Sequence, residues 1–244
     1  MIDLHCHFLP GLDDGPETLA EALALARAAV ADGITHSVLT PHVHLERYPN
    51  LRSSLELAVA RFTAELAQAN IELDVRAGAE ARLCPELIEM VAADQVPFLG
   101  AVDGYRILLL EFPHQIIPLG SLRFVNSLLR LKIRPLIAHP ERNKTIMAKP
   151  DKVREFTEAG CWLQLTAGSL AGRFGPQAEQ TAFALIDAGW NCVAATDAHS
   201  LPNRPPFLSE ARSALGQRYG ESVAHNMVYE KPAQILGLVG EQVA

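Results

Sequence analysis

Short apolar segments alternate with longer amphipathic segments along most of the chain, and this alternation limits the possible folds more than any other feature. Seven segments, mainly apolar and bounded by Gly, Pro, Asp or Asn, are predicted strands: 2–8, 36–42, 73–80, 105–113, 134–141, 162–168 and 191–199. Alternation of strands with helices predicts a parallel sheet covered by helices, and continuous apolar strands fit a sheet buried on both faces. We therefore expect either a closed (β/α) barrel or a doubly wound open sheet.

The predicted helices lie between these strands. They cover 16–31, 55–66, 85–93, 120–131, 151–159 and 177–188. Pro16 suits the first turn of a helix, and Gly33 follows the same helix as a stop signal. After Ser200 the alternation ends, and a Pro-rich turn leads to predicted helices near 208–218 and 231–238. Because no linker or low-complexity segment interrupts the 244 residues, we expect one domain, 1–244, with a C-terminal helical tail from about 205 to 244.

Metal-ligand residue types recur at the carboxyl ends of the predicted strands. They are His5, His7, His42, Glu80, Glu111, His139, Asp197 and His199. In a barrel these strand ends converge on one mouth, whereas in an open sheet they would lie in a row along one edge of the sheet. A single residue of this type at a strand end is more often an ordinary polar residue than a ligand. Chance does not explain eight such residues at equivalent positions in the fold. Their distribution therefore favours a barrel and predicts a site at its mouth.

The residue types point to transition metals. Side chains two apart on a strand share a face, so His5 pairs with His7, and Asp197 with His199. Imidazole and carboxylate together suit Mn²⁺, Fe or Zn²⁺ rather than Ca²⁺. Eight ligands exceed what one ion uses, so at least two metals are expected, with Glu80 as a candidate bridge.

Two adjacent aspartates follow the first strand. Either Asp13 or Asp14 could be a further ligand, and either could cap the helix expected near Pro16; we favour Asp14 as the ligand, but the residues alone leave the choice open.

Four other histidines fall outside this pattern. His36 begins a strand and His225 lies in the tail, so both are interpreted as structural. His44 and His114 lie near the predicted mouth and could support the ligands, although a structural role is the simpler interpretation.

A multinuclear His/carboxylate site activates water, so hydrolysis is the expected reaction class. Arg142 and Arg204 follow the fifth and seventh strands, and guanidinium groups bind phosphate through a fork of donors, which favours a phosphoester over an amide. Surface ion pairing, as with Glu141, is the alternative for each arginine. A cysteine-based phosphatase loop beginning at Cys6 would need arginine at position 12, where this chain has Leu12.

The composition and net charge argue against several classes of protein. A net charge of −7 argues against binding to nucleic acid or to an anionic membrane. The start lacks the basic and apolar regions of a secretory signal, and no apolar run approaches the ~20 residues of a membrane span. The four cysteines are scattered, which favours reduced thiols and a cytoplasmic location.

The motifs "MIDLHCHFLPGLDDGP", "TPH", "GAE", "LLEFP", "AHPERN" and "TDAHSLPNRPP" resemble, in order and over essentially the whole chain, the polymerase and histidinol phosphatase superfamily. Within it they resemble the metal-dependent bacterial protein-tyrosine phosphatases of capsule and exopolysaccharide gene clusters. The resemblance implies a distorted (β/α)7 TIM-like barrel and three metal ions, commonly Mn²⁺. It implies that the substrate is the phosphorylated Tyr-rich tail of a bacterial tyrosine autokinase, which would connect the protein to a membrane only indirectly. Relatives often carry Ser or Thr at Cys6.

The same resemblance implies a set of site residues. The metal ligands would be His5, His7, Asp14, His42, Glu80, Glu111, His139, Asp197 and His199. The phosphate-binding residues would be Arg142 and Arg204.

Three other functions remain open at this point. They are a histidinol-phosphatase-like enzyme acting on a small phosphomonoester, an amidohydrolase-type metal hydrolase, and a non-enzymatic interaction module. The sequence also leaves the bound metal, the cognate kinase and homo-oligomer formation open.

Overall fold

The computed structural model describes residues 1–238. Its strands are β1 (Ile2–Cys6), β2 (His36–Leu39), β3 (His42–Val43), β4 (Asp74–Ala77), β5 (Glu80–Arg82), β6 (Gly100–Val102), β7 (Tyr105–Glu111), β8 (Ile133–Ala138), β9 (Trp162–Thr166) and β10 (Cys192–Ala195). They form one sheet of order β1-β2-β4 and a second of order β10-β9-β8-β7-β5-β3. All pairings are parallel except that of the short β6 with β7.

The two sheets join into a ring. β2 and β3 are successive parts of one strand position, as are β4 and β5, and the N–H of Gly78 continues the pairing by donating to the carbonyl of Leu39 over 2.9 Å. At the other seam, the N–H of His7 donates to the carbonyl of Ala198 (2.8 Å), and that of Asp197 to the carbonyl of His5 (2.7 Å). Seven strand positions therefore surround one interior. The expected α/β class and the distorted (β/α)7 arrangement are confirmed.

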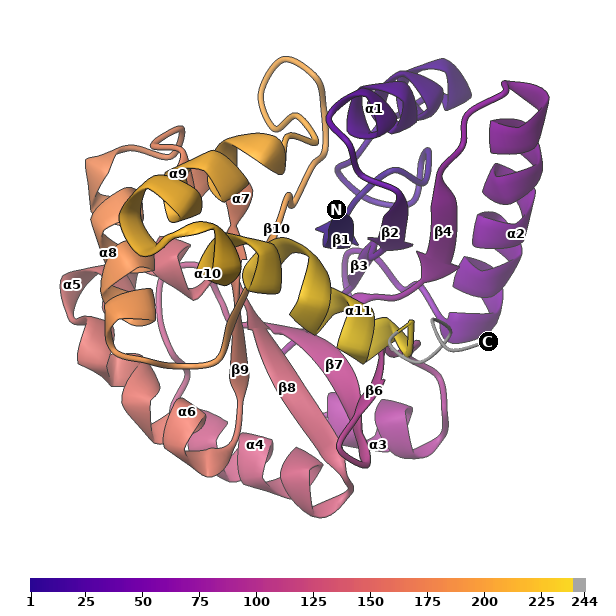
Figure 1. Ribbon diagram of the computed structural model, residues 1–244. Helices are drawn as coiled ribbons and strands as arrows, with labels where there is room; N and C mark the ends of the chain where they lie inside the picture. The colour runs from indigo at the N-terminus through magenta and orange to yellow at the C-terminus, as the bar shows by residue number, and fades with distance from the viewer. Residues whose placement is uncertain (239–244) are drawn as a thin grey trace, which may run out of the picture.

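Most of the helices cover the outside of the ring (Figure 1). The helices of the described residues are α1 (Leu19–Ala31), α2 (Arg52–Gln68), α3 (Leu87–Ala92), α4 (Ser121–Arg130), α5 (Lys144–Ala148), α6 (Arg154–Ala159), α7 (Ala167–Leu170), α8 (Pro176–Asp187), α9 (Ser209–Tyr219), α10 (Glu221–His225) and α11 (Lys231–Leu236). Among the described residues, none of these helices is long and apolar enough to cross a bilayer.

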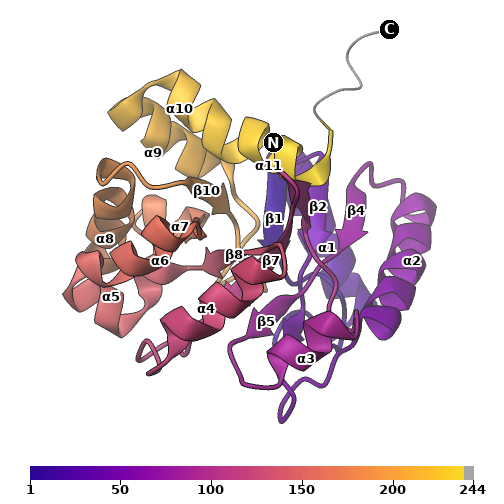
Figure 2. The same cartoon turned by 90° about the horizontal axis from the view of Figure 1, so that it is seen from below.

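Two apolar clusters result from this arrangement. The larger one packs the helices against the outer faces of the strands. The smaller one fills the interior at the amino ends of the strands, with Ile2 of β1, Val193 of β10 and Ile235 of α11. The helix α11 thus closes one end of the ring, as the view from below shows (Figure 2), and leaves the opposite end for polar side chains.

Several predicted boundaries were wrong for identifiable reasons. The first helix begins at Leu19, not Pro16, because the Thr18 side chain caps the N–H of Glu21 while the Glu21 carboxylate accepts from the Thr18 N–H. The strands predicted over 36–42 and 73–80 are each interrupted, so His42 and Glu80 begin short second segments rather than ending first ones. In the tail, α9 and α11 match the predicted helices, and α10 and a π-helical turn lie between them. Residues 239–244 of the expected tail lie outside the described residues.

Candidate metal centre

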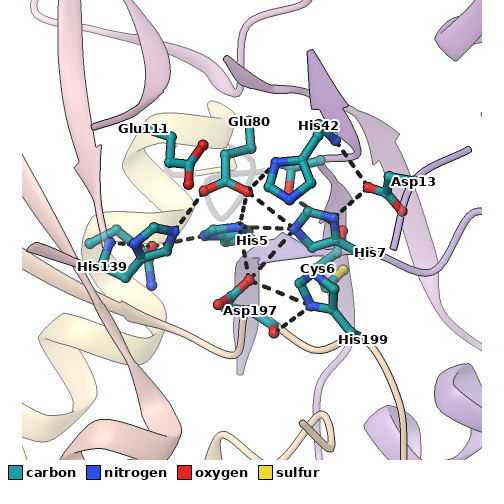
Figure 3. A network of polar contacts seen from close by, with 12 residues as sticks. His5, Cys6, His7, Asp13, His42, Glu80, Glu111, His139, Asp197 and His199 are labelled. Carbon is teal, nitrogen blue, oxygen red and sulfur yellow. Dashed lines mark hydrogen bonds and ion pairs between the residues drawn. The ribbon is translucent and has the colours of Figure 1, made fainter. Parts of the chain in front are cut away.

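The predicted ligands meet at the open end of the ring, and Figure 3 labels all of them except Asp14. Most of them follow or end a strand: His5 and His7 lie on and after β1, Glu111 ends β7, His139 follows β8, and Asp197 and His199 follow β10. His42 and Glu80 begin β3 and β5. His139 and Asp197 have positive φ angles of 32° and 53°, a backbone conformation that is rare outside glycine and that clusters at functional sites.

Eight of the nine residues fall into three overlapping groups whose candidate ligand atoms lie within 4.8 Å of one another. The groups are His7, Asp14, His42 and His199; His5, His7, Glu80 and Asp197; and His42, Glu80 and Glu111. Each pair of groups shares one side chain, which is His7, His42 or Glu80. His139 stands outside these groups, but its Nε2 lies 2.7 Å from Oε1 of Glu80.

Glu80 occupies the middle of the cluster and is fully buried. Its Oε2 lies 3.0 Å from Nδ1 of His42, 3.3 Å from Nε2 of His5 and 3.4 Å from Nε2 of His7. Even so, no well-aligned hydrogen bond reaches this oxygen from any residue in 1–238. A buried carboxylate oxygen approached by several imidazole nitrogens without hydrogen bonds fits a position between cations, because buried polar atoms are otherwise almost always bonded. The donor set, imidazole and carboxylate, suits Mn²⁺, Fe or Zn²⁺.

The two adjacent aspartates have different surroundings. An oxygen of Asp14 lies 3.3 Å from Nε2 of both His42 and His199, which places it in the first group. Asp13 turns away from that group: its Oδ2 lies 2.6 Å from Nδ1 of His7 and accepts the backbone N–H of His42 over 3.0 Å. Neither aspartate caps the helix.

A second buried side chain holds another imidazole, and the sequence interpretation missed it. Oε1 of Gln164, on β9, lies 2.8 Å from Nδ1 of His5 and accepts the N–H of His139 over 3.2 Å. Gln164 lies within the strand predicted over 162–168, but glutamine carries no metal-ligand signal.

The predicted phosphate-binding arginines both reach the cluster. Arg142 donates to the Asp197 carboxylate, and its guanidinium lies over the Phe174 ring, 4.5 Å from the centroid. Arg204 approaches Asp197 at 3.5 Å and Asp14 at 3.4 Å.

Electrostatics keep the acids ionised. Burial would raise the pKa of Glu80 and of Asp197, but the imidazoles around them, His5 foremost, hold both well below their usual values. Burial lowers the pKa of His199 to about 4, with His7 adding to the effect. Burial also opposes protonation of His7, yet the Asp13 carboxylate raises its pKa to about 9.

A pocket of about 380 Å³ opens over the cluster. Six of the candidate ligands and both arginines line it, together with His44, Arg47, Tyr48, Arg82 and His114. His44 and His114, whose roles the sequence left open, therefore lie at the mouth. His36 and His225 lie away from this pocket, on β2 and α10.

A parallel barrel with imidazoles, carboxylates and arginines gathered at the carboxyl ends of its strands defines the class of barrel metal-dependent hydrolases. The family model described as "Capsular polysaccharide synthesis, CpsB/CapC" matches residues 1–237, and the chain belongs to this family. The family resemblance predicted from the motifs is thereby confirmed.

Two relatives have similar sequences. Tyrosine-protein phosphatase YwqE from Bacillus subtilis (strain 168) is 33% identical over 225 residues, which cover 92% of this chain and 87% of the relative. The putative tyrosine-protein phosphatase CapC from Staphylococcus aureus is 32% identical over 210 residues, covering 86% of this chain and 81% of the relative.

Solved structures agree with this assignment. A chain from the crystal structures of YwqE from Bacillus subtilis and CpsB from Streptococcus pneumoniae, described as unique metal-dependent tyrosine phosphatases, superposes with a TM-score of 0.90. It is 32% identical, and the match covers 97% of this chain and 94% of that chain. An engineered organophosphate hydrolase derived from a lactonase superposes with a TM-score of 0.60 at 17% identity, which shows a shared fold only.

Proposed function

We propose that this chain is a metal-dependent protein-tyrosine phosphatase. The observation that carries the proposal is a cluster of imidazole and carboxylate side chains at one end of the ring, six of which line the same pocket as Arg142 and Arg204, in a chain similar to tyrosine phosphatases over most of its length. The proposed metal ligands are His5, His7, Asp14, His42, Glu80, Glu111, His139, Asp197 and His199.

Three ions, with Mn²⁺ favoured over Fe or Zn²⁺, would be held by these residues and would supply an activated water and positive charge. The three overlapping groups support this number, because each group offers at least three ligands. Asp13 and Gln164 would orient His7 and His5, as partners beyond the ligands commonly do in metal sites.

Arg142 and Arg204 would bind the non-bridging oxygens of the phosphoryl group. Both side chains are mostly buried at the wall of the pocket, and each already lies near Asp197. Guanidinium donors fixed at that wall stabilise the charge that spreads over the phosphoryl oxygens in the transition state. The leaving group is a phenolate with a pKa of about 10, so it requires less protonation than an alkyl alcohol would. Accordingly, no general acid is assigned.

A thiol nucleophile is not part of this proposal. The Cys6 thiol is fully buried, its Sγ lies 3.5 Å from the carbonyl oxygen of Val38, and burial raises its pKa well above the usual value. Such a thiol is neither ionised nor accessible near neutral pH.

The proposed substrate is the phosphorylated tail of a bacterial tyrosine kinase that acts in capsule or exopolysaccharide synthesis. The family description and the names of the relatives support this partner. The reaction is proposed to take place in the cytoplasm, where four free cysteines are compatible with reducing conditions.

Hydrolysis of p-nitrophenyl phosphate and of a phosphotyrosyl peptide tests the proposal. Activity should increase with added Mn²⁺ and disappear with a chelator. Arg142→Ala should lower kcat by about 10²–10³-fold, because it removes donors to the developing charge. Cys6→Ala should retain activity. Full activity of His139→Ala and Arg142→Ala would refute the proposal, and faster turnover of histidinol phosphate than of the peptide would favour a small-molecule phosphatase.

A further inference from the structure

A short loop after β3 forms one wall of the pocket. The main-chain groups of His44 and Tyr48 exchange two hydrogen bonds of 2.9 and 2.7 Å, which close the loop into a tight turn. The Asn50 side chain ties the following segment down by donating to the carbonyl oxygens of Leu12 and His42 over 3.1 and 2.9 Å. These hydrogen bonds therefore hold the loop in a defined position at the wall of the pocket.

Two side chains of this loop form a stack that begins at the cluster. The Tyr48 ring lies nearly parallel to the His42 ring, at an interplanar angle of 10° and a centroid distance of 5.6 Å. The Arg47 guanidinium lies 5.0 Å from the Tyr48 centroid, and Arg47 is exposed while also lining the pocket. The stack thus extends from His42, at the edge of the candidate metal site, to the positively charged Arg47 at the rim of the pocket, where the Tyr48 ring supports the guanidinium.

Arg47 differs from the other arginines that line the pocket. Arg142 and Arg204 lie near Asp197, and Arg82 forms a 2.8 Å ion pair with Glu111. Within residues 1–238, by contrast, no carboxylate lies within ion-pair distance of Arg47. Its charge is thus available to a molecule that enters the pocket, on a chain whose net charge is −7.

We propose that Arg47, supported by the ring of Tyr48, is a specificity-determining residue that binds an anionic side chain next to the phosphotyrosine of the substrate. This inference rests on the proposed function, because it places the phosphate of the phosphotyrosine at the cluster. Consecutive Cα atoms are about 3.8 Å apart, so a neighbouring side chain lies within reach of the rim. A carboxylate and a second phosphotyrosine offer the same chemistry, and both pair with a guanidinium.

The test compares four phosphotyrosyl peptides that differ only in the residue beside the phosphotyrosine: Glu, phosphotyrosine blocked against hydrolysis as a phosphonate analogue, Ala or Lys. The wild-type enzyme should show a kcat/KM about 3–5-fold higher for the Glu peptide than for the Ala peptide, mainly through KM, since exposed ion pairs contribute up to about 1 kcal/mol. The phosphonate peptide should show a larger increase in kcat/KM over the Ala peptide, and the Lys peptide should have the lowest kcat/KM of the four. High salt should reduce these differences.

Variants of the arginine make the test specific. Arg47→Ala should remove the preference for Glu over Ala, Arg47→Lys should retain part of it, and Arg47→Glu should reverse it in favour of the Lys peptide. Arg27→Glu is the matched control, because Arg27 is an exposed arginine on α1 away from the pocket and its substitution changes the net charge equally.

Two results would overturn the inference. One is an unchanged preference in Arg47→Ala. The other is an equal loss on all peptides and on p-nitrophenyl phosphate, which has no neighbouring residue and would mark Arg47 as a phosphate ligand instead. If the wild-type enzyme hydrolysed none of these substrates, the proposed function itself would fail, and the inference would fail with it.

Discussion

Adjacent residues in the first loop take different roles because successive side chains point in different directions. Asp14 points toward Nε2 of His42 and His199, whereas Asp13 accepts from the opposite ring nitrogen of His7 and from two backbone N–H groups, those of His42 and Gly15. An acceptor at Nδ1 fixes the tautomer that leaves Nε2 free to bind a metal. Asp13 is therefore interpreted as a positioning residue.

Asp13→Asn should weaken Mn²⁺ binding by about 10–100-fold, because the neutral amide holds the His7 ring less firmly and makes it less basic. Isothermal titration calorimetry of the metal-stripped protein measures this loss without relying on turnover. Asp14→Asn is the comparison. Because it removes a proposed ligand, it should weaken Mn²⁺ binding at least as much as Asp13→Asn does. Unchanged affinity in Asp13→Asn would show that its contacts serve folding alone.

The residues of the candidate site differ in how far the sequence could indicate them. The side chains at strand ends were predictable, because parallel strands of a barrel bring their carboxyl ends together whatever the loops do. Gln164 and Phe174 were not: an amide and an aromatic ring act here only through contacts with His5 and Arg142, and those contacts exist only in the folded chain.

At the level of elements, the breaks in the second and third strand positions were missed. A Cβ atom at Gly78 would lie 2.5 Å from a Val38 methyl carbon, so a larger residue at this break would have to displace Val38, which the strand pattern does not indicate. The sequence predicted the terminal helix over 231–238, but not its place across the ring, because helical periodicity does not identify the partner of an apolar face.

The contact between α11 and β6 provides a test of this closure. A Cβ added to Gly100 would lie 2.0 Å from the carbonyl oxygen of Ile235, so Gly100→Ala must push the helix away from the strand. We expect a loss of about 1–3 kcal/mol in the free energy of unfolding, typical of overpacking. Urea denaturation measures it. Ala101→Val, at the exposed neighbouring position of β6, should change stability little. Equal stabilities of the two variants would contradict the close approach.

At the level of the whole molecule, the candidate metal centre lies across both seams of the ring. His5 lies on β1, in the sheet of β1, β2 and β4, and His7 directly follows it. Glu80 and Glu111 belong to the other sheet, and Asp197 lies at the hydrogen-bonded junction between β1 and β10. A cation held by residues of both sheets connects them directly. Metal binding should therefore stabilise the whole fold and not only the mouth.

This coupling predicts a change in melting temperature that does not depend on catalysis. A ligand present at 100 times its Kd stabilises the folded state by about 2.7 kcal/mol, and 1 kcal/mol corresponds to roughly 2–4 °C in a chain of this size. Removing the metal with a chelator should therefore lower Tm by about 5–10 °C, and Mn²⁺ should restore it. Glu80→Gln should lose most of this response, because Glu80 contributes to two of the three groups, while Arg27→Glu should keep it. A Tm that is insensitive to chelator and to Mn²⁺ would mean that no metal joins the two sheets, even if the pocket binds phosphate.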